Sequence, residues 1–103
     1  MTNSTNHAQE EEFNSLLTCT RLFAELQTLE PLLIKNRSVF ITRTHHAHIH
    51  FRIMSNKTNA IVFARDFNWR HCNTETKLRT AIDQTYRDLI AANLITINTT
   101  THQ

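Results

Sequence analysis

Glycine is absent from all 103 residues, and Pro31 is the single proline. Every phosphate-binding loop built on glycine is therefore excluded, and with it the Walker-type and dinucleotide-binding classes of enzyme. Backbone positions that need a positive φ must instead use Asn, Asp, Ser or His. We therefore expect one of these four residue types wherever a tight turn needs that conformation.

Cysteines, net charge and long apolar runs are also scarce. The two cysteines, Cys19 and Cys72, form no CxxC pair, which favours two thiols in a reducing compartment. The net charge is +2 with neutral histidines, although protonation of all seven would raise it to +9. No apolar run approaches the ~20 residues of a membrane span, and the polar N-terminus lacks the features of a signal peptide. We therefore expect a cytoplasmic protein with no cofactor and no membrane contact.

Hydropathy patterns divide the chain into five elements. Three- and four-residue apolar steps predict two helices, and stretches rich in β-branched and aromatic residues predict three strands between them. The expected segments are a flexible tail at 1–8, a helix from 9 to about 30, strands at 38–44, 46–54 and 60–67, a helix after a cap at Asn73 or Thr74, and a flexible tail at 98–103. The order α-β-β-β-α favours one α+β domain over 9–97, a three-stranded antiparallel sheet with two helices packed on one face.

The first helix carries more apolar residues than one narrow stripe needs. Its expected buried stripe comprises Phe13, Leu16, Leu17, Thr20, Phe23, Ala24 and Gln27. Leu22 and Leu26 lie outside this stripe, so they either pack under residues 32–34 or form an exposed surface that binds a partner. The second interpretation makes Leu22 and Leu26 candidate binding residues.

Four histidines lie close together in the run THHAHIH, residues 44–50. In a strand at 46–54, alternation directs Ile49, Phe51 and Ile53 to the core and the histidines to the opposite, open face of the sheet. The candidate binding residues of this open face are Arg43, His46, His48, His50, Arg52 and Lys57.

The same histidines suggest an alternative zinc site. A hairpin that pairs Met54 with Ala60 would place His48 opposite Asp66. Two histidines in an HxH step point the same way and, with a carboxylate from the next strand, can bind zinc. His48, His50 and Asp66 are the candidate ligands, and a solvent-exposed face of polar residues is the other interpretation.

Nucleic-acid binding is a further alternative for the open face. Its arginines and histidines could contact phosphates, and Phe40 could stack on bases if Val39 and Ile41 face the core. The order α-β-β-β-α resembles that of the double-stranded-RNA-binding domain over roughly residues 9–94. That family opens its second helix with a basic cluster, whereas TETKLR offers only Lys77 and Arg79 beside an acid. The resemblance therefore implies the topology and not the RNA contacts.

No arrangement of residues indicates an enzyme. His71 and Cys72 are neighbours, but adjacent residues on an extended chain point to opposite sides. The remaining hypothesis is a small non-enzymatic protein–protein interaction module, with a protein partner and a homodimer both considered. Its most concrete form is an anti-CRISPR-like phage or mobile-element inhibitor of a host nucleic-acid-handling complex. Because the chain is slightly basic, direct docking is favoured over imitation of phosphate.

Overall fold

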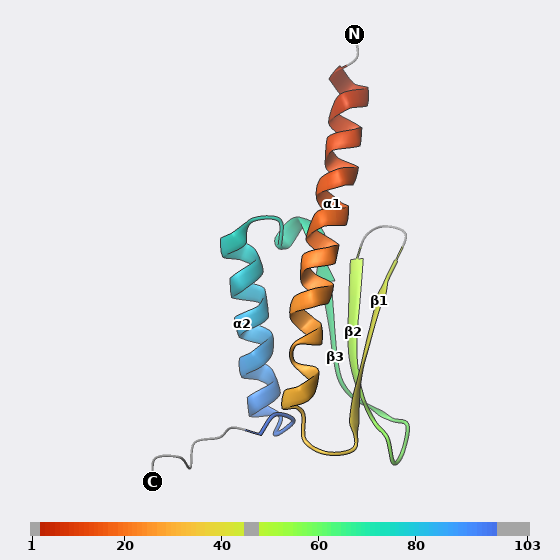
Figure 1. Ribbon diagram of the computed structural model, residues 1–103, viewed down its shortest axis with the longest axis vertical. Coiled ribbons are helices and arrows are strands. Elements are labelled where there is room, and N and C mark those ends of the chain that lie inside the picture. The colour runs from red at the N-terminus through yellow and green to blue at the C-terminus, as the bar shows by residue number, and fades with distance from the viewer. Residues whose placement is uncertain (1–2, 45–47, 97–103) are drawn as a thin grey trace.

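The computed structural model describes residues 3–44 and 48–96, and it confirms the expected α+β fold in the order α-β-β-β-α (Figure 1). In chain order the elements are α1 (Asn3–Gln27), the 3-10 helix η1 (Glu30–Leu32), β1 (Arg37–Arg43), β2 (His48–Ser55), β3 (Ile61–Asn68), the 3-10 helix η2 (Trp69–His71) and α2 (Glu75–Ala91). Helix α1 begins at Asn3 and not at Gln9, because the polar residues before Gln9 include no proline or glycine to stop it. Neither helix of the described part is long and apolar enough to cross a membrane.

The three strands form an antiparallel sheet with β2 in the centre. Strict alternation along β2 buries Ile49, Phe51 and Ile53 on the face that the helices cover, as the sequence predicts. Phe51 meets Phe63 of β3 edge to face, with ring centroids 6.1 Å apart. This inner face of the sheet is therefore the floor of the core.

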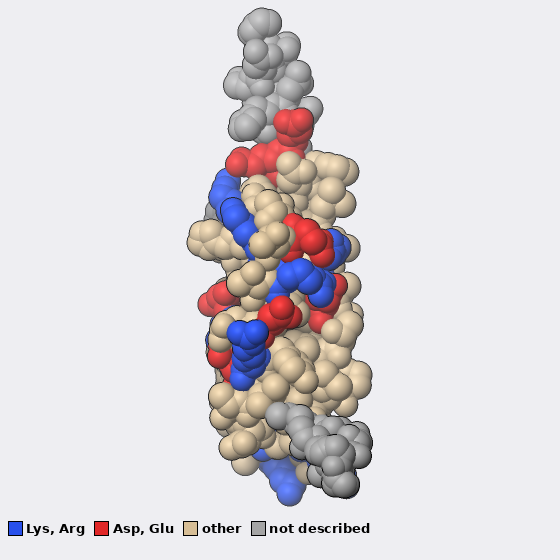
Figure 2. Space-filling view, turned by 90° about the vertical axis from the view of Figure 1, so that its left-hand side faces the viewer, with Lys and Arg blue, Asp and Glu red and all other residues tan. Residues whose placement is uncertain are grey.

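Both helices lie on that inner face, with α1 between α2 and the sheet strands in the view of Figure 1. Basic and acidic side chains are interspersed on the side of the molecule where α2 lies (Figure 2). Arg21 donates to Glu75 at 3.1 Å, and Arg79 pairs with both Glu25 and Glu75. The Arg21 guanidinium is the main reason that the pKa of Glu75 lies below its ordinary value. Because these pairs lie at the surface, each adds little to the stability of the fold.

The core side of α1 is not the stripe predicted from the sequence. Leu22 and Leu26 have no exposed surface and pack in the main core cluster with Cys19 and Leu29. Ser15 and Thr18 are the polar residues on the same buried side. The interpretation of Leu22 and Leu26 as an exposed binding surface is therefore wrong, because this side of α1 is the one that meets the sheet.

Asparagine takes the place of glycine at the turns. Positive φ occurs among the described residues at Asn36 (66°), Asn59 (60°) and Asn93 (62°). Asparagine tolerates the left-handed region better than other residues with a Cβ atom. The expectation drawn from the missing glycines is therefore confirmed at all three positions.

Candidate functional site

The outer sheet face, defined as the side of the sheet turned away from the helices, carries the strand-two histidines. His48, His50 and Arg52 alternate with the three buried residues of β2 and are each partly exposed. Arg52 lies between Phe40 of β1 and Ala64 of β3, and the Phe40 side chain is 51% exposed. The predicted open-face placement of His48, His50 and Arg52 is therefore correct, while His46 lies outside the described residues.

Asp66 of β3 binds two of these side chains. The Nδ1 of His50 donates to its Oδ1 at 2.8 Å, and Arg52 donates to the same oxygen at 2.8 Å. The hydrogen bond from His50, followed by that from Arg52, holds the pKa of Asp66 below its ordinary value. The carboxylate thus neutralises the arginine that would otherwise be the main cation of this face.

The pairing of β2 with β3 on which the predicted zinc site depends is wrong. Met54 pairs with Ile61 instead of Ala60, and a bulge between Ile53 and Met54 shifts the pairing once more. Asp66 consequently lies opposite His50, and His48 lies opposite Asn68. Among the residues that the structure describes, no three His, Cys, Asp or Glu side chains are grouped to hold a metal ion.

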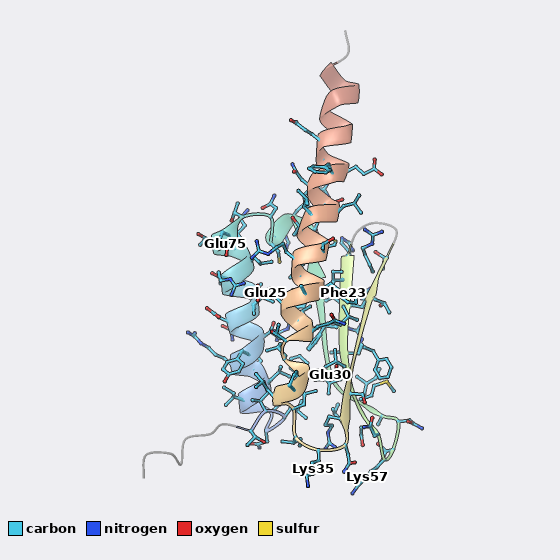
Figure 3. The ribbon with its side chains drawn as sticks, viewed as in Figure 1. Phe23, Glu25, Glu30, Lys35, Lys57 and Glu75 are labelled. Carbon is cyan, nitrogen blue, oxygen red and sulfur yellow. The ribbon has the colours of Figure 1, made fainter. Side chains whose placement is uncertain are left out.

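Two other residues assigned to the open face lie elsewhere. Arg43 follows Val39 and Ile41 in the alternation of β1 and pairs with buried Ile49, so it lies on the inner side of the sheet. Lys57 is exposed in the turn between β2 and β3, at the end of the molecule where Lys35 also lies (Figure 3). The six residues proposed for the open face are therefore not one site.

A larger candidate surface lies on α1, along the part of the helix that the core does not cover. The exposed fractions of its large apolar side chains are 61% for Phe13, 42% for Leu16, 51% for Leu17 and 37% for Phe23. We call this row the outer stripe, and it comprises Phe13, Leu16, Leu17, Thr20, Phe23, Ala24 and Gln27, all exposed. These are the residues that the sequence analysis expected to be buried. Helix α1 thus has two apolar sides, of which the domain uses one.

The C-terminal half of the outer stripe borders a groove between α1 and the sheet. Phe23 points from α1 toward the strands (Figure 3) and lines this groove with Thr20, Gln27, Arg43 and Ile49. Its volume is about 410 Å³, and its walls are mainly apolar. Arg43 brings a positive charge to the groove wall.

The two thiols are structural in character. Cys19 and Cys72 are both buried, and burial is the main reason that the pKa of each thiol is raised. A raised pKa keeps a thiol protonated and poorly nucleophilic near neutral pH.

Comparison with known proteins finds no matching family model, no matching curated protein and no matching solved structure. The outer stripe is therefore the main candidate for a functional surface of this chain.

Proposed function

We propose that this chain is a non-enzymatic protein–protein interaction module that binds through the outer stripe of α1. The observation that carries the proposal is the exposure of four large apolar side chains along α1 that the core does not cover. A contiguous apolar patch on a protein surface is costly in water and typically marks a contact surface. A helix whose apolar side docks against a partner is a common recognition mode.

The charges near the stripe favour a protein partner over nucleic acid. Glu10 and Glu12 lie beside the N-terminal end of the stripe and are exposed. Acidic side chains at this place repel phosphates. On the outer sheet face, Arg52 is neutralised by Asp66, so Phe40 lacks the basic surroundings of a nucleic-acid stacking site. The nucleic-acid and zinc alternatives therefore have less support than the protein-binding proposal.

Inhibition of a nucleic-acid-handling complex, in the manner of anti-CRISPR proteins, is the most concrete form of this proposal. It would use the outer stripe to dock on a protein component of the complex, because the chain as a whole has a net charge of +2 and does not imitate nucleic acid. Its test is whether a stripe variant such as Leu16→Glu loses an inhibition that the unaltered chain shows.

Site-specific photo-crosslinking in cells that make the protein tests the general proposal. A photoreactive amino acid replaces Leu16 in the stripe or, as the matched control, Tyr86 on α2, which is also an exposed large side chain. We expect protein adducts from position 16 at least several-fold in excess of those from position 86. Equal yields from the two positions would refute the outer stripe as the contact surface.

A further inference from the structure

The spacing along the outer stripe matches a helix that packs against another helix. Phe13, Leu16, Thr20 and Phe23 follow steps of three, four and three residues, which are the a and d positions of a heptad. Leu17 and Ala24 widen the row on one side. The N-terminal end of α1 also rises beyond α2 and the sheet, as Figure 1 shows. This part of the helix therefore has room for a second helix along it.

We propose that the partner on the outer stripe is a second copy of this chain, with the two α1 helices packed antiparallel about a two-fold axis level with residue 18. This inference rests on the proposed function and names the occupant of the same surface. Phe13 of each copy then lies opposite Phe23 of the other, and Leu16 lies opposite Thr20. The N-terminal half of α1 in one copy, which projects beyond its own domain, therefore covers the C-terminal half of α1 and the adjoining groove in the other copy.

The groove gives the second helix a place to lie. Residues 12, 16, 19 and 23 follow one line along α1, because they are four, three and four positions apart. Cys19 and Phe23 belong to this line and help to line the groove, which Arg43 also lines. The two-fold axis crosses the helix pair, so the flank of α1 that carries residues 12, 16, 19 and 23 faces the same way in both copies. The Phe13–Leu17 segment of the second copy therefore lies beside the groove of the first.

Charge complementarity selects the antiparallel arrangement. Glu12 of the second copy lies level with Ala24 and on the groove flank, where it faces Arg43. In a parallel pair, Glu10, Glu11 and Glu12 of the two copies would instead lie side by side. Like charges at that distance repel. The antiparallel pair also brings opposite ends of the helix dipoles together.

The apolar surface available is enough for a modest dimer. The exposed parts of Phe13, Leu16, Leu17 and Phe23 amount to about two whole apolar side chains per copy. A standard interface buries about 800 Å² per partner, and a single helix pair with one groove falls at the lower end of that class. We therefore expect a dimer that dissociates in the micromolar range.

Sedimentation velocity of the full chain over a range of concentrations tests the proposal. We expect a mass near 12.1 kDa at high dilution and one that rises toward twice 12.1 kDa at about 100 μM. Phe13→Glu is expected to weaken association at least tenfold, and the matched control Tyr86→Glu on α2 is expected to change it less than twofold. Circular dichroism and Trp69 fluorescence show that each variant keeps its fold.

A charge exchange tests the antiparallel register. Glu12→Arg and Arg43→Glu are each expected to weaken the dimer several-fold, while the chain with both substitutions returns to within about twofold of the original. High salt reduces all three differences, because the pair lies at the rim of the interface. If the double substitution restores nothing, the antiparallel register is overturned.

Two results separate this inference from the proposed function. A monomer at all concentrations whose position 16 still crosslinks to a different protein overturns the dimer and leaves the interaction module intact. A monomer with no excess of crosslinks at position 16 overturns both. A dimer that survives Phe13→Glu but is lost with Phe40→Glu would place the interface on the outer sheet face and overturn the α1 pairing.

Discussion

Replacing Leu26 with alanine tests which side of α1 faces the core. The side chain has no exposed surface and belongs to the main core cluster. The substitution removes three carbon atoms, a loss of about 2.4 kcal/mol at ~0.8 kcal/mol for each buried CH₂ group. The cavity left behind adds to this, so we expect the free energy of unfolding to fall by about 3–5 kcal/mol.

Leu32→Ala is the matched control, because it makes the same chemical change at a side chain that is 42% exposed. Because the Leu32 side chain is partly in water already, only roughly half of the free energy for burying three carbon atoms is lost, and no closed cavity forms. We therefore expect the free energy of unfolding to fall by about 1 kcal/mol. Urea unfolding followed by the fluorescence of buried Trp69 measures both variants, at one low protein concentration. Equal losses at the two positions, or a loss below about 1 kcal/mol for Leu26→Ala, would refute the assignment of the core side of α1.

Three smaller perturbations test the local structure. Thr74 caps α2 by accepting from the backbone N–H of Lys77, so Thr74→Ala should lower the free energy of unfolding by about 1 kcal/mol in urea titration, and no change would contradict the cap. Asn59 has a φ of 60°, so Asn59→Ala should cost about 1 kcal/mol more than Asn59→Gly, whereas equal effects would argue against the left-handed turn. Asp66→Asn should cost less than about 1 kcal/mol near neutral pH, because the carboxylate is 58% exposed. Since folding lowers the pKa of Asp66, this difference should be present above its unfolded-state pKa of about 4 and disappear as the pH falls through the folded-state pKa, and a difference that persists in acid would contradict the His50 and Arg52 hydrogen bonds.

The sequence was sufficient for the fold class and for the faces of β2 and α2. In β2, Ile49, Phe51 and Ile53 alternate with His48, His50 and Arg52, so a two-residue period leaves one choice of inner face. In α2 the pattern predicts a buried stripe of Leu78, Ala81, Ile82, Thr85, Leu89 and Ala92 or Asn93; the structure buries Leu78, Ile82, Thr85 and Leu89 and partly buries Ala81, whereas Ala92 and Asn93, at the end of the helix, are exposed. Where only one side is apolar, periodicity identifies the core.

The face of α1 could not be assigned in the same way. Two apolar rows run along α1, and the outer one contains two phenylalanines and two leucines. The row that packs in the core includes Ser15 and Thr18, which weaken its apolar pattern. Periodicity reports that both rows exist, whereas the choice between them depends on how α1 meets the sheet.

The pairing of His50 with Asp66 was also beyond sequence reasoning. A bulge adds one residue to one strand without any change in composition, and it alters which side chains meet across the sheet. The Asn-rich turn indicates a hairpin but does not fix its register. The zinc hypothesis was wrong in its geometry for this reason, although the residues it named do lie on neighbouring strands.

The edge position of β1 has a consequence for the solubility of the protein. Its apolar residues Val39, Phe40 and Ile41 lie between Arg37 at one end and Arg43 at the other. A second β1 added antiparallel along this edge and centred on Phe40 would place each Arg37 across from Arg43 of the other strand. Like charges directly opposite each other destabilise a strand pair. The two arginines therefore disfavour edge-to-edge pairing of two β1 strands in this register.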